Sequence, residues 1–394
     1  MPRNVTAPRS LAGAERILPA VVSPWIRTPE ALRGLALSLE GCHAIGLDTE
    51  SDSLYHHFEK VCLLQVATDR GEGFLVDTLA LRDLAPLAAA MADPALVKVL
   101  HGADYDVTTL KRDFGFSFAS IFDTMIAARL LGRSEIGLAA VARDELGVAL
   151  SKHNQKDDWS RRPLTPQQED YALADVRHLV PLRDRLEPKL ASAGRLDWLR
   201  EECAAVAALP PVARRHDPDA YLDLKGARRL SPRALAVLRE LFAWRERRAE
   251  ATDTPAFRIL GNESLVRLAE LRPRDPAGLA AVPGVLPRLR REAGDLLAAV
   301  GRAEGLQEGE LPRVARAPRP VVSDAVRLRA DRLKAWRARK AAELDVDVSV
   351  VLPQRLIDRL AEAAPEDAAG LAAIGGLRRW RAEAFGTDLL AAVS

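Results

Sequence analysis

The stretch "HAIGLDTES", residues 43–51, joins a short apolar run to two carboxylates. Such a run is typical of a buried strand. In a strand, residues i and i+2 point to the same face, so Asp48 and Glu50 project together. Carboxylates this close repel each other unless a cation lies between them. The stretch therefore predicts one of two things: a cation site at the end of a buried strand, or a strand that ends in a polar turn with both acids in water.

The flanking sequence predicts a mixed α/β sheet. Residues 61–67 and 74–79 read as two further strands, separated by the turn "DRGEG", so that an antiparallel meander forms. Beyond them, strands and helices alternate, which indicates a mixed sheet. The later expected elements are a helix over 79–91 that stops at Asp93–Pro94, a strand within 96–104, a helix over 104–115 that Gly115 closes, a short strand within 119–124, and mostly helices from Met125 to about residue 205.

The second half of the chain is helical in pattern and contains an internal repeat. "WRERRAEA" begins at Trp244 and "WRARKAAE" at Trp336, 92 residues apart, and "DPAGLAAVPG" from Asp275 matches "DAAGLAAIGG" from Asp367 at the same offset. Self-similarity of this extent indicates a duplicated helical domain, with both tryptophans in bundle cores. The predicted division is 1–205, a linker 206–224, 225–305, a Pro/Arg-rich linker 306–323, and 324–394.

Length and composition restrict the class of protein. A chain of 394 residues is expected to form two or three domains, and 48% hydrophobic residues suffice for globular cores. No apolar run approaches the length of a membrane span, and prolines interrupt the N-terminal apolar stretch. The three cysteines are scattered, which suits a reducing compartment. We therefore expect a cytoplasmic protein without a membrane association.

The net charge of +2 hides an asymmetry along the chain. Residues 1–210 carry 24 basic and 29 acidic side chains, residues 211–340 carry 28 and 17, and residues 341–394 carry 5 and 9. An arginine-rich block with an excess of +11 is the electrostatic pattern expected for a nucleic-acid partner, although a solvated helical face would show it too.

Further acids stand where a site could assemble. Asp106 follows a predicted strand at the start of a helix, and Tyr171 and Asp175 are four residues apart on another helix, so they share a face. In α/β sheets, ligands gather where strands end and helices begin. Clustered Asp and Glu without His or Cys suit Mg²⁺ or Mn²⁺. Two such ions would stabilise the attacking and the leaving oxygen of a phosphoryl displacement.

The motifs "GLDTES", "HGADYDVTTLKRDFG" and "YALADVRHL", in this order, resemble the three motifs of DEDDy-type 3′→5′ exonucleases. The tyrosine four residues before the last Asp marks this branch. The duplicated unit resembles two HRDC domains, and the whole arrangement resembles the ribonuclease D family. The resemblance implies a ribonuclease H-like mixed-sheet exonuclease domain followed by two all-α HRDC-like helical bundles.

By this resemblance, Asp48, Glu50, Asp106 and Asp175 are the metal-binding acids and Tyr171 orients the attacking water. Asp48 would touch both ions, Glu50 and Asp175 would hold the ion on the nucleophile side, and Asp106 would act largely through water. Asp104 competes with Asp106 as the acid of the second motif, and the family spacing favours Asp106. Asp123 is expected to cap a helix or to support the site.

Six more residues are candidate substrate contacts, each with a structural alternative. His101 is either a substrate contact or a satisfied structural histidine, Tyr55 and Phe58 are either stacking faces for bases or parts of an ordinary hairpin loop, and Trp159, Arg161 and Arg162 either grip phosphates or anchor a packed loop.

The expected function is a metal-dependent 3′→5′ exoribonuclease that releases nucleoside 5′-monophosphates. The resemblance implies RNA 3′ ends as substrates, with tRNA precursors or other structured RNAs, two Mg²⁺ or Mn²⁺ ions, and no small-molecule cofactor. A DNA exonuclease is the first alternative, because no 2′-OH contact can be located in the sequence. A catalytically dead nucleic-acid-binding scaffold is the second.

Overall fold

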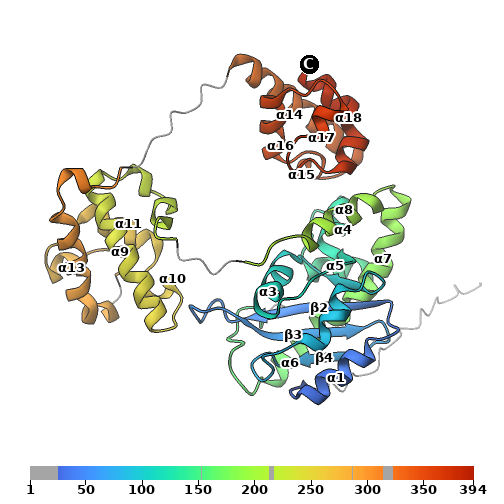
Figure 1. The fold of residues 1–394 in the computed structure, drawn as a ribbon, viewed down its shortest axis with the longest axis horizontal. Helices are drawn as coiled ribbons and strands as arrows, with labels where there is room; N and C mark the ends of the chain where they lie inside the picture. Colours follow the sequence, from blue (N-terminus) through green and yellow to red (C-terminus); the bar gives the residue numbers. More distant parts are fainter. Residues whose placement is uncertain (1–24, 152, 213–216, 286, 314–322) are drawn as a thin grey trace, which may run out of the picture.

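The computed structural model describes residues 25–151, 153–212, 217–285, 287–313 and 323–394. They form one α/β body and two helical bodies (Figure 1). Parts of both predicted linkers, 213–216 and 314–322, lie outside the described residues, as do residues 1–24. Each body has a core of its own, with a second, smaller cluster in the α/β body.

A six-stranded mixed sheet forms the centre of the α/β body. The strands lie in the order β1-β4-β3-β2-β5-β6. The strands β2, β3 and β4 make the predicted antiparallel meander, while β5 and β6 continue the sheet parallel to β2. Their bounds are β1 Trp25–Ile26, β2 Ala44–Ser51, β3 Val61–Thr68, β4 Gly73–Val76, β5 Val97–Leu100 and β6 Ile121–Asp123.

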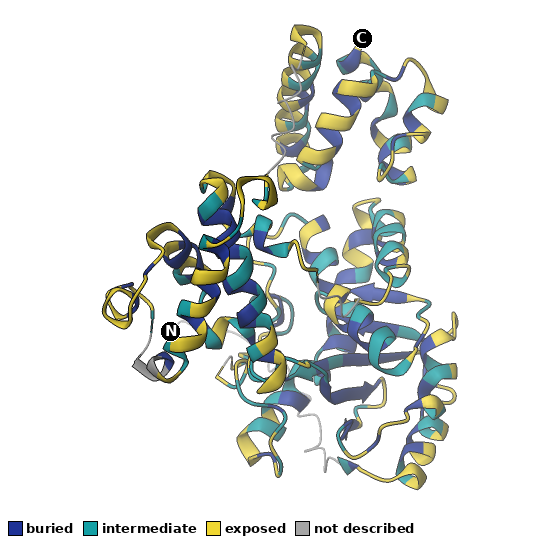
Figure 2. Ribbon diagram, turned by 60° about the vertical axis from the view of Figure 1, so that its left-hand side comes forward, coloured by how far each residue is buried: buried dark blue, intermediate teal, exposed yellow. Residues whose placement is uncertain are grey.

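Helices pack on both faces of this sheet, so its strands are buried (Figure 2). The helix α6 crosses β2, β3 and β4, while α7 packs on β2 and β5. The helix α3 ends as predicted at Gly115, which has a φ of 68°. The helices are α1 Pro29–Ser38, α2 Ala88–Ala92, α3 Asp104–Phe114, α4 Thr124–Leu130, α5 Leu138–Leu146, α6 Pro166–Arg177, α7 Leu179–Ser192 and α8 Leu196–Ala207, with a 3₁₀ turn η1 Ala85–Leu87.

The two helical bodies repeat one design. Arg245 donates from Nη1 to the carbonyl oxygen of Leu260, and Arg337 makes the same bond to Leu352, 92 residues later. Trp244 and Trp336 are each 7% exposed, which confirms their predicted core positions. The first body contains η2 Ala220–Asp223, η3 Ala227–Arg229, α9 Pro232–Ala251, α10 Ala256–Ile259, α11 Asn262–Leu271, α12 Pro276–Ala280, η4 Pro287–Glu292, α13 Ala293–Glu304 and η5 Glu308–Glu310. The second contains α14 Asp324–Leu344, α15 Val348–Val351, α16 Gln354–Ala363, α17 Ala368–Ala372 and α18 Arg379–Val393.

One predicted element is wrong in extent. Helix was expected over residues 79–91, but the chain turns first and becomes helical only from Ala85. The Asp77 carboxylate accepts hydrogen bonds from the backbone N–H groups of Leu79 and Ala80, which fixes the turn. Pro86 then stands in the first turn of η1, where its missing N–H is tolerated. The strand β1 and the helix α1 were not predicted.

The second helical body is joined to the α/β body through α8. The rings of Trp198 and Trp380 stack with centroids 4.2 Å apart. The Glu202 carboxylate accepts hydrogen bonds from Arg381 Nη1 at 2.6 Å and from Trp380 Nε1 at 3.1 Å. Val350 of α15 packs into the core of the α/β body itself. No helix among the described residues is long and apolar enough to span a membrane.

Candidate active site

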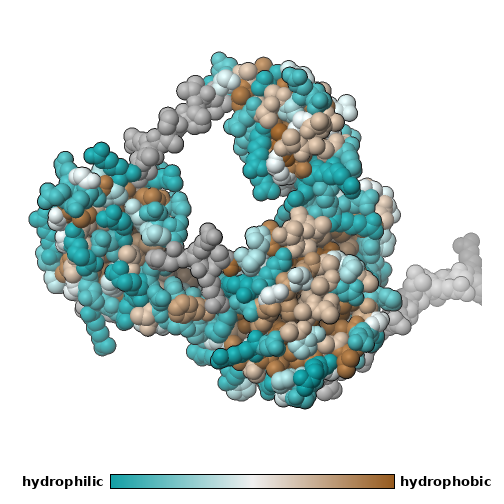
Figure 3. Space-filling model, viewed as in Figure 1, coloured by the Kyte–Doolittle hydropathy of each residue, from teal (hydrophilic) through white to brown (hydrophobic). Residues whose placement is uncertain are grey.

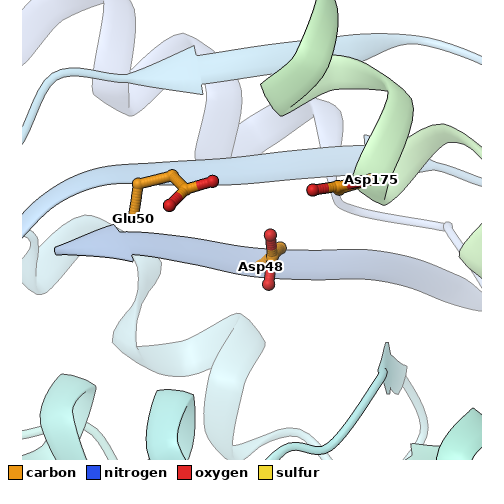
Figure 4. Close-up of side chains that lie close together, drawn as sticks. All are labelled: Asp48, Glu50 and Asp175. Carbon is orange, nitrogen blue, oxygen red and sulfur yellow. The ribbon is translucent and has the colours of Figure 1, made fainter. Parts of the chain in front are cut away.

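Three carboxylates meet above the sheet. Asp48 and Glu50 lie two residues apart on β2 and point to the same face, as the strand period requires. Asp175 reaches toward them from α6 (Figure 4). Oxygen atoms from all three carboxylates lie within 4.8 Å of one another. The prediction that Asp48 and Glu50 project together is therefore confirmed, and the polar-turn alternative does not describe the strand.

The cluster concentrates negative charge in a poorly solvated place. Burial, together with repulsion from Asp106 and Asp175, raises the pKa of Asp48 well above its ordinary value. Burial and the charge of Asp48 do the same for Glu50. Burial raises the pKa of Asp175 to about 6. Carboxyl groups in this state bind protons or cations strongly, because either one relieves the repulsion.

Asp106 supports the cluster from the other face of β2. Its Oδ1 accepts a hydrogen bond of 2.5 Å from Thr49 Oγ1, and Thr49 points away from Asp48 along the strand. Burial raises the pKa of Asp106 to about 7. Asp104, its rival in the sequence, is exposed at the first turn of α3. The structure thus buries Asp106 beside Thr49, outside the group of three carboxylates, and leaves Asp104 in solvent. The role of Asp106 as a metal-binding acid stays a prediction.

Asp123 holds the backbone that carries Asp106. As predicted it caps a helix, because its Oδ1 accepts from the N–H groups of Met125 and Ile126 in α4. Its carboxylate also accepts from Gly102 N at 3.1 Å and from Ala103 N at 2.8 Å. Asp123 therefore ties the turn before α3 to the start of α4.

Tyr171 stands one helical turn before Asp175, and both side chains line the same cleft. Burial and then the charges of Asp175 and Glu50 raise the pKa of the Tyr171 phenol above its ordinary value. The hydroxyl therefore keeps its proton at neutral pH and acts as a hydrogen-bond donor rather than as a base.

The cleft over the acids has a volume of about 400 Å³. Its walls combine the acids with apolar side chains that the sequence analysis missed, and no local pattern separates these from ordinary core residues. The lining residues besides the acids and Tyr171 are His101, Met125, Leu138, Leu150, Gln155 and Leu179, with several small neighbours.

His101 lines the cleft but is held by the fold. The Thr124 hydroxyl donates to the carbonyl oxygen of Leu100 at 3.0 Å, so it accepts from His101 Nδ1 at 2.8 Å. Burial lowers the pKa of His101, which favours the neutral ring. Both the substrate-contact and the structural interpretation of His101 are compatible with this position.

Tyr55 and Phe58 lie outside the cleft lining and beside the first helical body. The Arg258 guanidinium covers the Tyr55 ring at 4.2 Å, and the Tyr55 hydroxyl donates to the carbonyl oxygen of Lys156. The backbone N–H of Phe58 donates to Asp253, which also bonds His56 Nδ1 at 2.7 Å. The loop is thus a contact between domains, in which Arg258 occupies one side of the Tyr55 ring, and the stacking role of Tyr55 stays a prediction. Phe58 remains 46% exposed.

The loop that contains Trp159 matches the packed-loop alternative. Trp159 is 1% exposed and packs with Leu164 and Leu173, so it offers no free ring face. Arg162 donates from Nε to Asp77 at 2.9 Å and from Nη2 to the Cys62 carbonyl oxygen at 2.7 Å. These contacts correct the phosphate-gripping hypothesis for Trp159 and Arg162, because both side chains are used by the fold.

Arg161 differs from its neighbours. Its side chain is 81% exposed and pairs with Asp158 at 3.1 Å. An exposed pair of this kind holds the guanidinium weakly. Arg161 therefore stays a candidate for a phosphate contact at the surface.

The donor set fits a divalent cation. Asp48, Glu50 and Asp175 offer only oxygen atoms, which hard cations such as Mg²⁺ and Mn²⁺ prefer. Burial raises the pKa of all three acids, and a bound divalent cation would offset this cost of ionisation. No other group of three or more such side chains occurs among the described residues.

The fold and the acid cluster define a 3′→5′ exonuclease followed by two helical modules. The family model described as 3′-5′ exonuclease matches residues 24–191, and the HRDC domain model matches 234–300 and 328–393. Ribonuclease D of Acidiphilium cryptum is 34% identical over 93% of this chain and 91% of its own length. Exosome complex component 10 of Rattus norvegicus is 33% identical over 71% of this chain and 33% of its own length.

A solved structure agrees with this assignment. Escherichia coli RNase D, described as an exoribonuclease involved in structured RNA processing, superposes with a TM-score of 0.70 at 26% identity. The match covers 94% of this chain and 98% of the other. The chain belongs to the ribonuclease D family. The predicted fold class, a mixed-sheet nuclease with HRDC modules, is confirmed.

Proposed function

We propose that this member of the ribonuclease D family shortens RNA from its 3′ end and releases nucleoside 5′-monophosphates with the help of two divalent cations. The observation that carries the proposal is the meeting of Asp48, Glu50 and Asp175, whose oxygens lie within 4.8 Å of one another at the floor of an open cleft.

Each residue of the site has a task in this proposal. Asp48, Glu50 and Asp175 hold Mg²⁺ or Mn²⁺, and Asp106 supports them from behind β2. The bound cations would supply a hydroxide-like nucleophile and neutralise charge on the departing 3′ oxygen. Tyr171 keeps its proton, so its hydroxyl can orient a water molecule for attack on the terminal phosphodiester.

The excess of basic side chains in residues 211–340 favours a structured RNA, such as a tRNA precursor, as the substrate. Lys225, Arg229 and Arg267 line a hollow of about 570 Å³ on the first helical body together with Glu263 and Glu270, and all three basic side chains are exposed. The surface of that body is largely hydrophilic, and an opening lies between it and the second helical body (Figure 3). Such cations bind phosphates without regard to sequence, so they would hold the body of an RNA while its end enters the cleft.

We also propose that the domains and linkers are divided at residues 205, 224, 305 and 323, and that the protein is cytoplasmic. The α/β body ends with α8 at Ala207, and both family-model matches to the HRDC domain fall inside the predicted modules. All three cysteines are buried and unpaired, as in a reducing compartment.

The test uses single-stranded RNA and DNA of the same sequence, with Mn²⁺, Mg²⁺ or EDTA. The proposal expects stepwise shortening of RNA with either metal and none in EDTA. Equal or faster shortening of DNA would instead support a DNA exonuclease. Binding of RNA without any shortening would support the scaffold alternative.

A further inference from the structure

Gln65 is a buried amide without a hydrogen bond. It lies in β3, where the sequence "VCLLQVAT" otherwise offers mostly apolar side chains. Its exposed fraction is 0%, and neither Oε1 nor Nε2 has a partner. Among the described residues, no other side chain has two buried polar atoms left without a partner. An unpaired buried amide destabilises a fold, so its presence calls for another explanation.

The register places this amide beside the acid cluster. Gln65 lies directly opposite Asp48 in the antiparallel β2–β3 pair. Residues opposite each other point to the same face, with Cβ atoms about 4.5–5.5 Å apart. Leu173 of α6 and Leu63, two residues before Gln65, belong to one buried cluster, and Leu173 borders a hollow with Ala67, two residues after Gln65. The Gln65 side chain is therefore enclosed between β3 and α6, on the side where Asp48 and Asp175 converge.

We propose that Gln65 is a positioning residue for the acid cluster, and that its Nε2 donates a hydrogen bond to the Asp48 carboxylate when the cluster holds divalent cations. This inference rests on the proposed metal role of the cluster. A ligand carboxylate needs a donor that fixes its orientation, and such supporting partners commonly change metal affinity by about 10- to 100-fold. An amide suits the task because it donates without adding charge. A lysine would compete with the cations, and a carboxylate would add repulsion.

The test compares wild type with Gln65→Met, which keeps the shape of the side chain and removes the amide. Mn²⁺ binding is measured by titration calorimetry without RNA, and Tm is measured in EDTA. We expect Mn²⁺ to bind about 10- to 100-fold more weakly to the variant. The metal-free Tm should equal or exceed that of wild type, because an unpaired buried amide has been removed.

A matched control is Thr78→Val. Thr78 is also buried in the α/β body, but its hydroxyl donates to the Val61 carbonyl oxygen at 2.6 Å and lies outside the cleft lining. This variant should lose stability and keep its Mn²⁺ affinity, which is the reverse of the Gln65→Met result.

Two outcomes would overturn the inference. One is a Gln65→Met protein that binds Mn²⁺ as tightly as wild type. The other is a metal-free Tm well below that of wild type, which would show that the fold itself uses the amide. If wild type binds no Mn²⁺ and degrades no RNA, the proposed function fails instead, so the two failures are distinguishable.

Discussion

Replacing Asp175 by asparagine should make the metal-free protein more stable while it abolishes hydrolysis. Burial raises the pKa of Asp175 from 3.8 to about 6. One pKa unit corresponds to about 1.4 kcal/mol, so keeping this carboxylate ionised at pH 8 costs the folded protein about 3 kcal/mol. The asparagine variant does not bear this cost, and its free energy of unfolding in EDTA should rise by up to about 3 kcal/mol.

The stability of the metal-free protein should change with pH in a direction that can be measured. The folded protein binds the Asp175 proton more tightly than the unfolded chain does. Stability of metal-free wild type should therefore fall as the pH rises from about 4 to about 6, and the loss should persist above that range. At pH 4 the carboxyl group is protonated in the folded protein, so the advantage of Asp175→Asn should disappear there.

Scanning calorimetry can measure the stability of both proteins. The transition of the nuclease domain is the one that shifts when Mn²⁺ is added. Saturating Mn²⁺ should reverse the order of stability, because wild type binds the ion more tightly than the variant does. Two results would refute the reasoning. One is a variant less stable than wild type in EDTA at pH 8. The other is a well-folded variant with near-wild-type turnover.

Three further predictions concern other parts of the molecule. Tyr171→Phe should lower kcat by roughly 10²-fold and leave RNA affinity unchanged. A collapse of affinity with kcat retained would make Tyr171 a substrate-binding residue. Replacing Lys225 and Arg229 by glutamine should weaken binding of a tRNA-sized RNA and flatten its salt dependence, with hydrolysis of a short single strand unchanged. Equal salt slopes in both proteins would leave these cations without a role in binding. Glu202→Gln should destabilise the second helical body by about 3 kcal/mol, because it leaves the buried Arg381 without its charge partner. The pair of the exposed Glu343 with the half-buried Lys340 supplies the control, and Glu343→Gln should change Tm little. A Tm equally unaffected in both glutamine variants would contradict the buried-pair argument.

Local patterns were sufficient to predict much of the site. The period of two in β2 places Asp48 beside Glu50, and the spacing of four in α6 places Tyr171 beside Asp175. Both rules depend only on backbone geometry. The contact of β2 with α6 depends on the topology of the sheet. It was predicted from the resemblance of the motifs to those of the exonuclease family and not from local patterns.

Contacts between distant segments could not be predicted in the same way. Trp198 lies in a stretch for which only helix was predicted, and no local pattern indicates that its ring stacks on Trp380 of another domain. The sequence left two alternatives for Tyr55, a stacking face for a base or part of an ordinary loop, and the contact of its ring with Arg258 of another domain could not be predicted. Gln65 did leave a signal in the sequence, since a lone amide within an apolar strand is unusual, but its importance depends on the register with Asp48.

The most direct test of the central claim is the product of a single cleavage. An RNA whose 3′-terminal nucleotide is labelled is incubated with the protein and Mn²⁺ in water enriched in oxygen-18, and the first product is identified by mass spectrometry. The account predicts a labelled nucleoside 5′-monophosphate whose phosphate carries one oxygen-18 atom, absent with EDTA or with Asp48→Asn. A nucleoside 3′-monophosphate, an internal fragment as the first product, or unchanged release by Asp48→Asn would contradict it.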